Sequence, residues 1–209
     1  MSDLKVDGIT AATANTAVTI KGAGTGKVVL GDGNLVFPDA DGAAGTFITT
    51  NGSAALSFAA AGKIVQVVNV TDSAVATGTT TITRDDSIPQ NGEGVEYMTL
   101  AITPTNASNK LLIQIAVWYS VTATTPMTAA LFQDGTAAAL AAVANYGHNA
   151  TQAQLTNFNH YMTAGTTSAT TFKLRIGGQS GTVTFNGASG ARLYGGVSSS
   201  SITITEISA

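Results

Sequence analysis

Apolar residues in the first third of the chain occur as short patches separated by turn signals. The patches are residues 18–20, 28–30, 35–37, 47–48 and 56–58, and the stretches "GAGTG", "GDG", "PDADGAAG" and "NGS" lie between them. Glycine, Asn-Gly and Asp-Gly favour tight turns. Strands this short bury too little apolar surface to offset a backbone entropy cost of about 1–2 kcal/mol per residue. A single copy of this zone therefore needs partners.

We predict that residues 20–62 form a short intertwined β shaft, in which identical chains cover one another's apolar patches around an axis. Each patch then packs against further copies of itself. The side chains expected inside this shaft are Val28, Leu30, Leu35, Phe37, Phe47 and Phe58.

From residue 63 onward the apolar residues follow longer, alternating patterns. The stretches "KIVQVVNV" (63–70) and "NKLLIQIAVWYSV" (109–121) are largely apolar on both faces, as in strands that are covered on both sides. Many strands separated by turn signals are typical of a sandwich or jelly roll. We therefore predict an all-β protein with a C-terminal jelly-roll-like β-sandwich over residues 63–209. The further strand candidates are residues 79–84, 96–103, 128–133, 155–162, 170–176, 182–185 and 201–207.

One connection and one segment of this zone need separate treatment. In "LFQDGTAA" the pair Asp134 and Gly135 predicts a two-residue hairpin turn. The following residues, 136–147, are rich in alanine and could form a short helix that ends at Gly147. As a strand, they would offer a smooth surface suited to another subunit. We favour the strand, because tertiary context often outweighs local helix propensity.

The composition supports the β assignment and excludes several classes of binding partner. Only 10% of the 209 residues are charged and the net charge is -3, so no basic surface for nucleic acid or an anionic membrane is expected. The chain has no cysteine, which excludes a disulfide framework and a thiolate metal site. No apolar run approaches the length of a membrane span, and the N-terminus has no secretory signal pattern. We expect a soluble protein, made in a cytoplasm, without a cofactor.

Two blocks of the sequence resemble bacteriophage fibre proteins. The block "GTGKVVLGDGNLVFPDADGAAGTFITTNGSAALSF" resembles the short repeats of tail-fibre shafts. The block "DDSIPQNGEGVEYMTLAITPTNASNKLLIQ", with the later "AALFQD" and "SSITITEI", is similar to a β-sandwich head at the C-termini of such fibres. The resemblance implies a non-enzymatic, homotrimeric virion fibre, assembled in the host cytoplasm, whose heads attach to a glycan or protein of the host surface.

The same resemblance leaves other functions open. The alternatives are a capsid-attached head fibre or decoration protein, and a small tailspike depolymerase. In either fibre case residues 1–19 would dock to other virion proteins, with Leu4, Val6 and Ile9 as the candidate contacts of an added strand. A disordered tail is an equally good interpretation of these residues.

Candidate chemistry is sparse. A glycan-cleaving site needs paired carboxylates, and Asp85, Asp86, Glu93 and Glu96 are the candidates. They stand in a polar stretch without an apolar pocket to raise the pKa of one of them, so we predict a solvated loop and no enzyme. One histidine per chain could supply three ligands at a threefold axis, but histidines in such loops mostly form hydrogen bonds. We therefore predict no metal.

For ligand binding, the informative stretch is "NYGHNATQAQLTNFNHY" (145–161), because amides and aromatic rings are the groups that bind sugars. A polar loop followed by a half-exposed strand is the alternative. Trp118 lies in an apolar stretch and is expected in the core. The candidate receptor-binding residues are Tyr146, His148, Asn149, Gln152, Asn157, Asn159 and Tyr161.

Overall fold

The computed structural model describes residues 29–30, 35–36, 42–43, 46–50, 56–60, 64–147 and 152–209. The chain divides into two compact units between Gly62 and Lys63, and each is described here by itself. Several predictions fall on other residues. The docking contacts Leu4, Val6 and Ile9 and the shaft positions Val28 and Phe37 lie outside the described residues.

The first unit contains short antiparallel pairs. Strand β1 (Val29–Leu30) pairs with β2 (Leu35–Val36), which sets Leu30 opposite Leu35. Strand β3 (Thr46–Thr50) pairs with β4 (Leu56–Ala60). Phe58 is half-buried, whereas Phe47 keeps 49% of its surface exposed. Intertwining with two further copies therefore stays a prediction. In such an assembly the other copies would cover the exposed Phe47 side chain.

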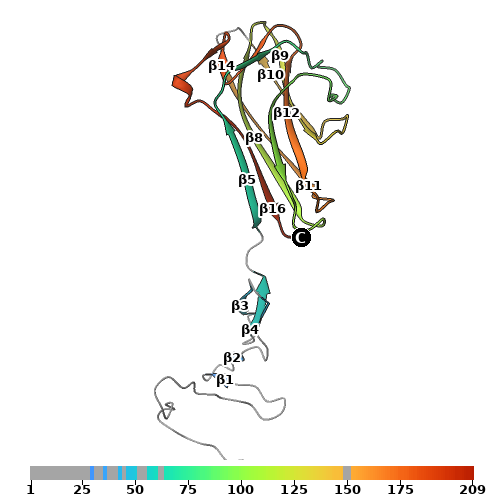
Figure 1. Ribbon diagram of the computed structural model, residues 1–209, viewed down its shortest axis with the longest axis vertical. Coiled ribbons are helices and arrows are strands. Elements are labelled where there is room, and N and C mark those ends of the chain that lie inside the picture. Colours follow the sequence, from blue (N-terminus) through green and yellow to red (C-terminus); the bar gives the residue numbers. More distant parts are fainter. Residues whose placement is uncertain are drawn as a thin grey trace, which may run out of the picture. The chain divides into compact units, whose positions relative to one another are not determined.

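The second unit consists of strands and one short 3-10 turn (Figure 1). Across the part of the chain that is described, no helix is long and apolar enough for a membrane crossing. The elements are β5 (Ile64–Asp72), β6 (Ala76–Gly78), β7 (Val95–Ile102), β8 (Lys110–Val121), β9 (Thr125–Gln133), β10 (Ala141–Gly147), β11 (Gln154–Thr163), β12 (Thr170–Gly178), β13 (Val183–Phe185), β14 (Gly187–Ala188), β15 (Ala191–Arg192), η1 (Tyr194–Gly196) and β16 (Ser200–Ile207).

The strands pair in a nested order. Innermost, β9 pairs with β10; around this hairpin β8 pairs with β11, β7 with β12, β6 with β13, and β5 with β16, all antiparallel. One sheet has the order β10-β9-β12-β7, and the other has β5-β16-β8-β13-β6 with β11 on the free side of β8. A long hairpin wrapped in this way is a jelly roll. The prediction of an all-β protein with a jelly-roll-like sandwich is confirmed.

The core lies between the two sheets. Alternate residues of β8, from Leu111 to Val121, are each at most 2% exposed. Met127, Leu131, Phe172, Leu174 and Ile176 of the other sheet are fully buried in the same cluster. Each such side chain stabilises the fold by about 1.5–3 kcal/mol relative to an exposed position. The period of two along β8 therefore determines which face of the sheet becomes the interior.

The opposite face of the β5–β16–β8–β11 sheet is open to solvent. We call it the outer face, and Val67 and Tyr161 on it are 55% and 57% exposed. The sequence predicted that the strands at 63–70 and 109–121 are covered on both sides, and in the single chain only the inner side is covered. The outer face consists of Asn69, Thr71, Val67, Leu112, Gln114, Ala116, Trp118, Leu155, Asn157, Asn159, Tyr161, Ser201, Thr203 and Thr205.

Other local predictions also need correction. Residues 79–84 form no strand; they are irregular, and Ile82 is buried against Ala130 and Phe132. The turn at Asp134 and Gly135 exists, but the connection is longer than two residues because β10 begins only at Ala141. The alanine-rich segment contains strand β10, not a helix. Pairing along β9 thus overrides its helix propensity.

A buried carboxylate fixes the end of the sheet where β5 begins. Glu206 is fully buried and accepts hydrogen bonds from Gln66 Nε2 at 2.6 Å, Asn109 Nδ2 at 2.6 Å and the backbone N of Thr105 at 2.8 Å. Burial alone raises the pKa of Glu206, but these bonds outweigh it and lower the pKa from 4.5 to about 2. The ionised group therefore joins β16, β5 and the connection between β7 and β8.

We expect Glu206→Ala to lower the free energy of unfolding by about 2–4 kcal/mol, because several donors lose their acceptor. The measurement is urea unfolding at neutral pH. Glu96→Gln is the matched control: Glu96 forms partly exposed ion pairs with Lys173 and Arg175, so their loss costs about 1 kcal/mol or less. Equal effects of the two variants would contradict the anchoring role of Glu206.

The same carboxylate predicts a pH dependence. Since its folded pKa of about 2 lies below the ordinary 4.5, its contribution is complete above pH 4.5 and is lost as the pH falls toward 2. Unfolding measured at intervals through this window should show stability falling with acid. In Glu206→Gln, which has no titrating group at this position, the fall should be shallower, and an unchanged slope would show that other groups cause it.

Candidate functional site

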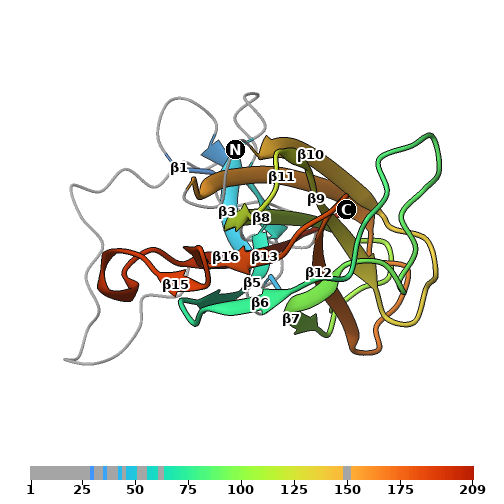
Figure 2. The ribbon, with the colours of Figure 1, turned by 90° about the horizontal axis from the view of Figure 1, so that it is seen from above.

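Two strands share one edge of β8, and the chain leaves the sheet between them. Strand β16 pairs with β8 up to Ala116, and β13 pairs with it from Tyr119 onward. The residues that connect β13 to β16, 186–199, form an excursion that includes the β14–β15 hairpin and the turn η1. Seen from above in Figure 2, this excursion projects away from the sheets.

Buried polar groups fix the base of the excursion at Trp118. The backbone N of Asn186 donates to the Trp118 carbonyl at 2.9 Å, and the Trp118 backbone N donates to Ser200 Oγ at 3.0 Å. Asn186 Nδ2 donates to the carbonyl of Asp72 at 2.8 Å, while its Oδ1 accepts from Ser200 Oγ at 2.6 Å. Asn186 and Ser200 are both fully buried. These bonds replace the sheet pairing that is interrupted at Trp118.

The tip of the excursion has a strained backbone and exposed apolar groups. Tyr194 has a φ of 48° and is 76% exposed, and Gly195 and Gly196 follow with φ of 66° and 93°. Val197 is 84% exposed. A bulky residue in the left-handed region costs about 1–3 kcal/mol and is common at functional sites. The sequence "GARLYGGVS" therefore holds an aromatic ring in solvent at an energetic cost.

A hollow of about 440 Å³ lies beside the excursion. It is lined by Trp118 of β8, by Gln152, Ala153 and Gln154 at the start of β11, and by Leu193 and Tyr194 of the excursion. Trp118 is half-buried, so the prediction that it belongs to the core is wrong: its neighbours Val117 and Tyr119 face the interior and alternation turns it to the outer face. The Gln154 side chain donates to the Tyr146 carbonyl at 2.8 Å and ties β11 to β10.

The structure does not gather the described members of the predicted receptor patch into one site. Tyr146 lies on β10, exposed, in the other sheet from Asn157, Asn159 and Tyr161 on β11. Asn157 and Asn159 line a hollow of about 380 Å³ with Gln114 and Thr203 on the outer face. Gln152 lines the hollow beside Trp118. His148 and Asn149 lie outside the described residues.

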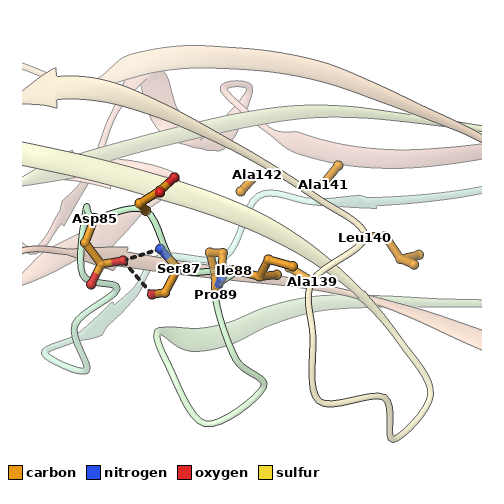
Figure 3. A pocket seen from close by; sticks show the side chains of 9 residues that line it. Asp85, Ser87, Ile88, Pro89, Ala139, Leu140, Ala141 and Ala142 are labelled. Atoms are coloured by element: carbon orange, nitrogen blue, oxygen red, sulfur yellow. Dashed lines mark hydrogen bonds between the residues drawn. The ribbon is translucent and has the colours of Figure 1, made fainter.

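A third hollow lies between the loop at residues 85–89 and the residues that lead into β10 (Figure 3). Its volume is about 420 Å³, and three alanines and Leu140 from residues 139–142 line one side. Asp85 accepts hydrogen bonds from the Oγ and the backbone N of Ser87, the latter at 2.7 Å. These bonds lower the pKa of Asp85, which favours the ionised form. The loop is thus braced by its own acid group.

The other carboxylates considered for catalysis also hold local structure. Glu93 accepts a bond from the Gln90 backbone N at 2.7 Å, and Glu96 pairs with Arg175 at 3.2 Å. His160 is partly buried in β11, and this desolvation lowers its pKa. Within the described ranges, no group of three or more His, Cys, Asp or Glu could hold a metal ion. These groups provide braces for loops and strands.

The fold and its projecting excursion define an all-β jelly-roll domain with surface hollows beside both sheets. The family described as the Pgp3 C-terminal domain matches residues 64–209, which is well over half of the chain. The chain belongs to this family.

This membership corrects the identification made from the sequence. The chain resembles bacteriophage fibres in its turn and core residues, but its family is the Pgp3 C-terminal domain and not a tail-fibre family. The predictions of a phage attachment fibre, of the capsid-fibre and tailspike alternatives, and of a virion location depended on that resemblance and are wrong. Short strands and Gly-rich turns are shared by many β proteins, so they did not distinguish these families.

No curated protein matches the chain. Among solved structures, infectious bursal disease virus Gt strain matches with 12% identity over 74% of this chain and 40% of that chain, at a TM-score of 0.35. Bacillus endospore appendages match with 15% identity over 73% of this chain and 97% of that chain, at a TM-score of 0.27. The chain spans less than half of the virus protein, and likenesses this weak carry no functional argument.

The brace at Asn186 leads to a prediction. In Asn186→Gly the new glycine tolerates the φ of 52° at this position, but the side-chain hydrogen bonds of Asn186 are lost. We therefore expect the free energy of unfolding to fall by about 2–3 kcal/mol. Trypsin should also cleave faster after the exposed Arg192, as seen by mass spectrometry of the fragments. Gln179→Ala, an exposed control, should change neither measurement, and a wild-type cleavage rate in Asn186→Gly would refute the brace.

Proposed function

We propose that the chain is a non-enzymatic binding protein that acts as a homotrimer, with its second unit presented to a glycan or protein ligand. The observation that carries this proposal is the outer face, which a single chain leaves open although it is largely uncharged and partly apolar. The occupant that we assign to the end of this face around Val67 and Tyr161 is another copy of the same chain, whereas the end at Trp118 stays open in the assembly.

The composition of the outer face supports self-association. Strand register places Tyr161, Leu112, Thr205 and Val67 in one row across β11, β8, β16 and β5. The next rows toward Trp118 contain amides, hydroxyls and alanine. Interface cores are enriched in aromatic residues and depleted of charge, which is the character of these rows. Interfaces between identical chains bury surface of this kind in closed, symmetric rings.

The first unit supports the same partner. The β3–β4 pair exposes Phe47 and Ile48, which are 49% and 47% exposed in the single chain. A two-stranded hairpin is marginal in water by itself. The chain continues from this pair into β5, an edge strand of the sheet that carries the outer face. Identical copies would cover this exposed pair as well, and three copies is the number that we propose.

The non-enzymatic part of the proposal depends on how the acid groups are used. Asp85, Glu93 and Glu96 each bond to a residue of their own loop or sheet, as described above. Asp85 is stabilised in its ionised form, whereas a general acid needs a carboxyl with a raised pKa. Asp85, Glu93 and Glu96 thus serve the fold, and the open hollows suit binding.

The test is sedimentation velocity of the full chain over a wide concentration range. The expected mass is three times the 21.0 kDa of one chain. Tyr161→Asp places a charge in the apolar row of the outer face and should shift the protein to smaller species. Thr99→Asp, an exposed position on the other sheet opposite Lys173, is the control and should remain trimeric. A folded wild-type monomer at all concentrations would refute the proposal.

A further inference from the structure

The hollow beside Trp118 has the groups that a saccharide site requires. Neutral sugars bind through the C–H face of the ring against an aromatic side chain and through hydroxyls to amide groups. Trp118 and Tyr194 supply the aromatic surface, and Gln152 and Gln154 supply the amides. Its volume of about 440 Å³ lies within the range of small-ligand sites. All of its lining side chains are uncharged, which favours a neutral ligand.

The surroundings hold these groups in place. The Trp118 backbone is bonded on both sides by Asn186 and Ser200, and Gln154 is held by the Tyr146 carbonyl. Tyr194 stands on a turn with three consecutive positive φ values, and a Cβ added at Gly196 would lie 3.1 Å from Arg192 Cδ. A tyrosine that is held exposed by a strained backbone has little packing role in the isolated domain. Such placement is explained by contact with a ligand.

We propose that the hollow formed by Trp118, Leu193, Tyr194, Gln152 and Gln154 binds a neutral saccharide. The inference rests on the proposed function, because it names the ligand class of the same domain. The hollow lies about eight residues along β8 from Lys110, or about 26 Å, at the end of the outer face away from the start of β5. Three such sites in a trimer would give multivalent binding to a glycan surface.

The sequence provides a direct reporter, since Trp118 is the single tryptophan of the chain. The experiment is a titration of the full-length protein with maltotriose, mannotriose and N-acetylchitotriose at millimolar concentrations, followed by tryptophan fluorescence. We expect a saturable change with at least one of these sugars. Tyr194→Ala should weaken that binding by about tenfold, the effect of losing one aromatic contact. Gln152→Ala should weaken it as well.

Controls separate the hollow from the rest of the surface. Ile88→Ala removes an exposed apolar side chain of the loop at residues 85–89, which lines a different hollow, and should leave sugar affinity unchanged. Sedimentation of each variant measures assembly independently of sugar binding. If a variant loses sugar binding but remains a trimer, the effect lies at the hollow. If the wild-type protein forms no trimer, the proposed function is refuted.

Three results would overturn the saccharide site: no saturable change with any probe, equal affinity in Tyr194→Ala, or binding to glycoproteins that persists after enzymatic deglycosylation. The last result would identify a protein ligand. Because Tyr194 is exposed on a loop, its replacement leaves the core untouched, so these outcomes do not depend on a folding defect.

Discussion

One edge of β8 pairs with two partner strands, and this sharing determines where the excursion and the hollow beside Trp118 lie. Strands β16 and β13 meet end to end along that edge, and the chain between them has to leave the sheet. A sheet normally completes its backbone hydrogen bonds with a continuous neighbour. Here the interruption falls at Trp118, where Asn186 and Ser200 supply the missing partners. The excursion, its exposed tyrosine and the adjacent hollow all follow from this break.

Two buried polar clusters stabilise opposite ends of the same sheet. Glu206 joins β5, β16 and the connection before β8 at one end, and Asn186 joins β13, β16 and β8 at the other. Buried polar groups are costly unless all their bonds are made, so such clusters define one register of the strands. On the inner side of the sheet, alternate residues of β8 fill the core, and Thr156 of β11 donates a buried hydrogen bond to the Tyr119 hydroxyl.

The sequence predicted the fold class well, because alternating apolar residues along β8, β11 and β16 determine which side is buried. It predicted a strand at 136–147 only as the better of two possibilities, because a run of alanines shows no alternation that distinguishes a strand from a helix, and the strand itself covers only 141–147. It failed at residues 79–84, where β-branched residues indicated a strand but the chain is irregular and Ile82 packs against Ala130 and Phe132 of β9.

The proposed site was not predicted from the sequence. The Gly-rich stretch "GARLYGGVS" signals a turn, but nothing in it shows that the turn lies beside Trp118. The phage resemblance failed because turn and core residues specify architecture and not family.

The nested pairing also has a consequence for biosynthesis. Strand β5, the first of the jelly roll, hydrogen-bonds to β16, which is the last described strand to leave the ribosome. Contacts between residues so distant in the chain form slowly, and the domain cannot close until nearly all of it has been made. During that interval the apolar side of β8 stays uncovered. Cellular yield should therefore depend more on chaperones and growth temperature than on the stability of the finished domain.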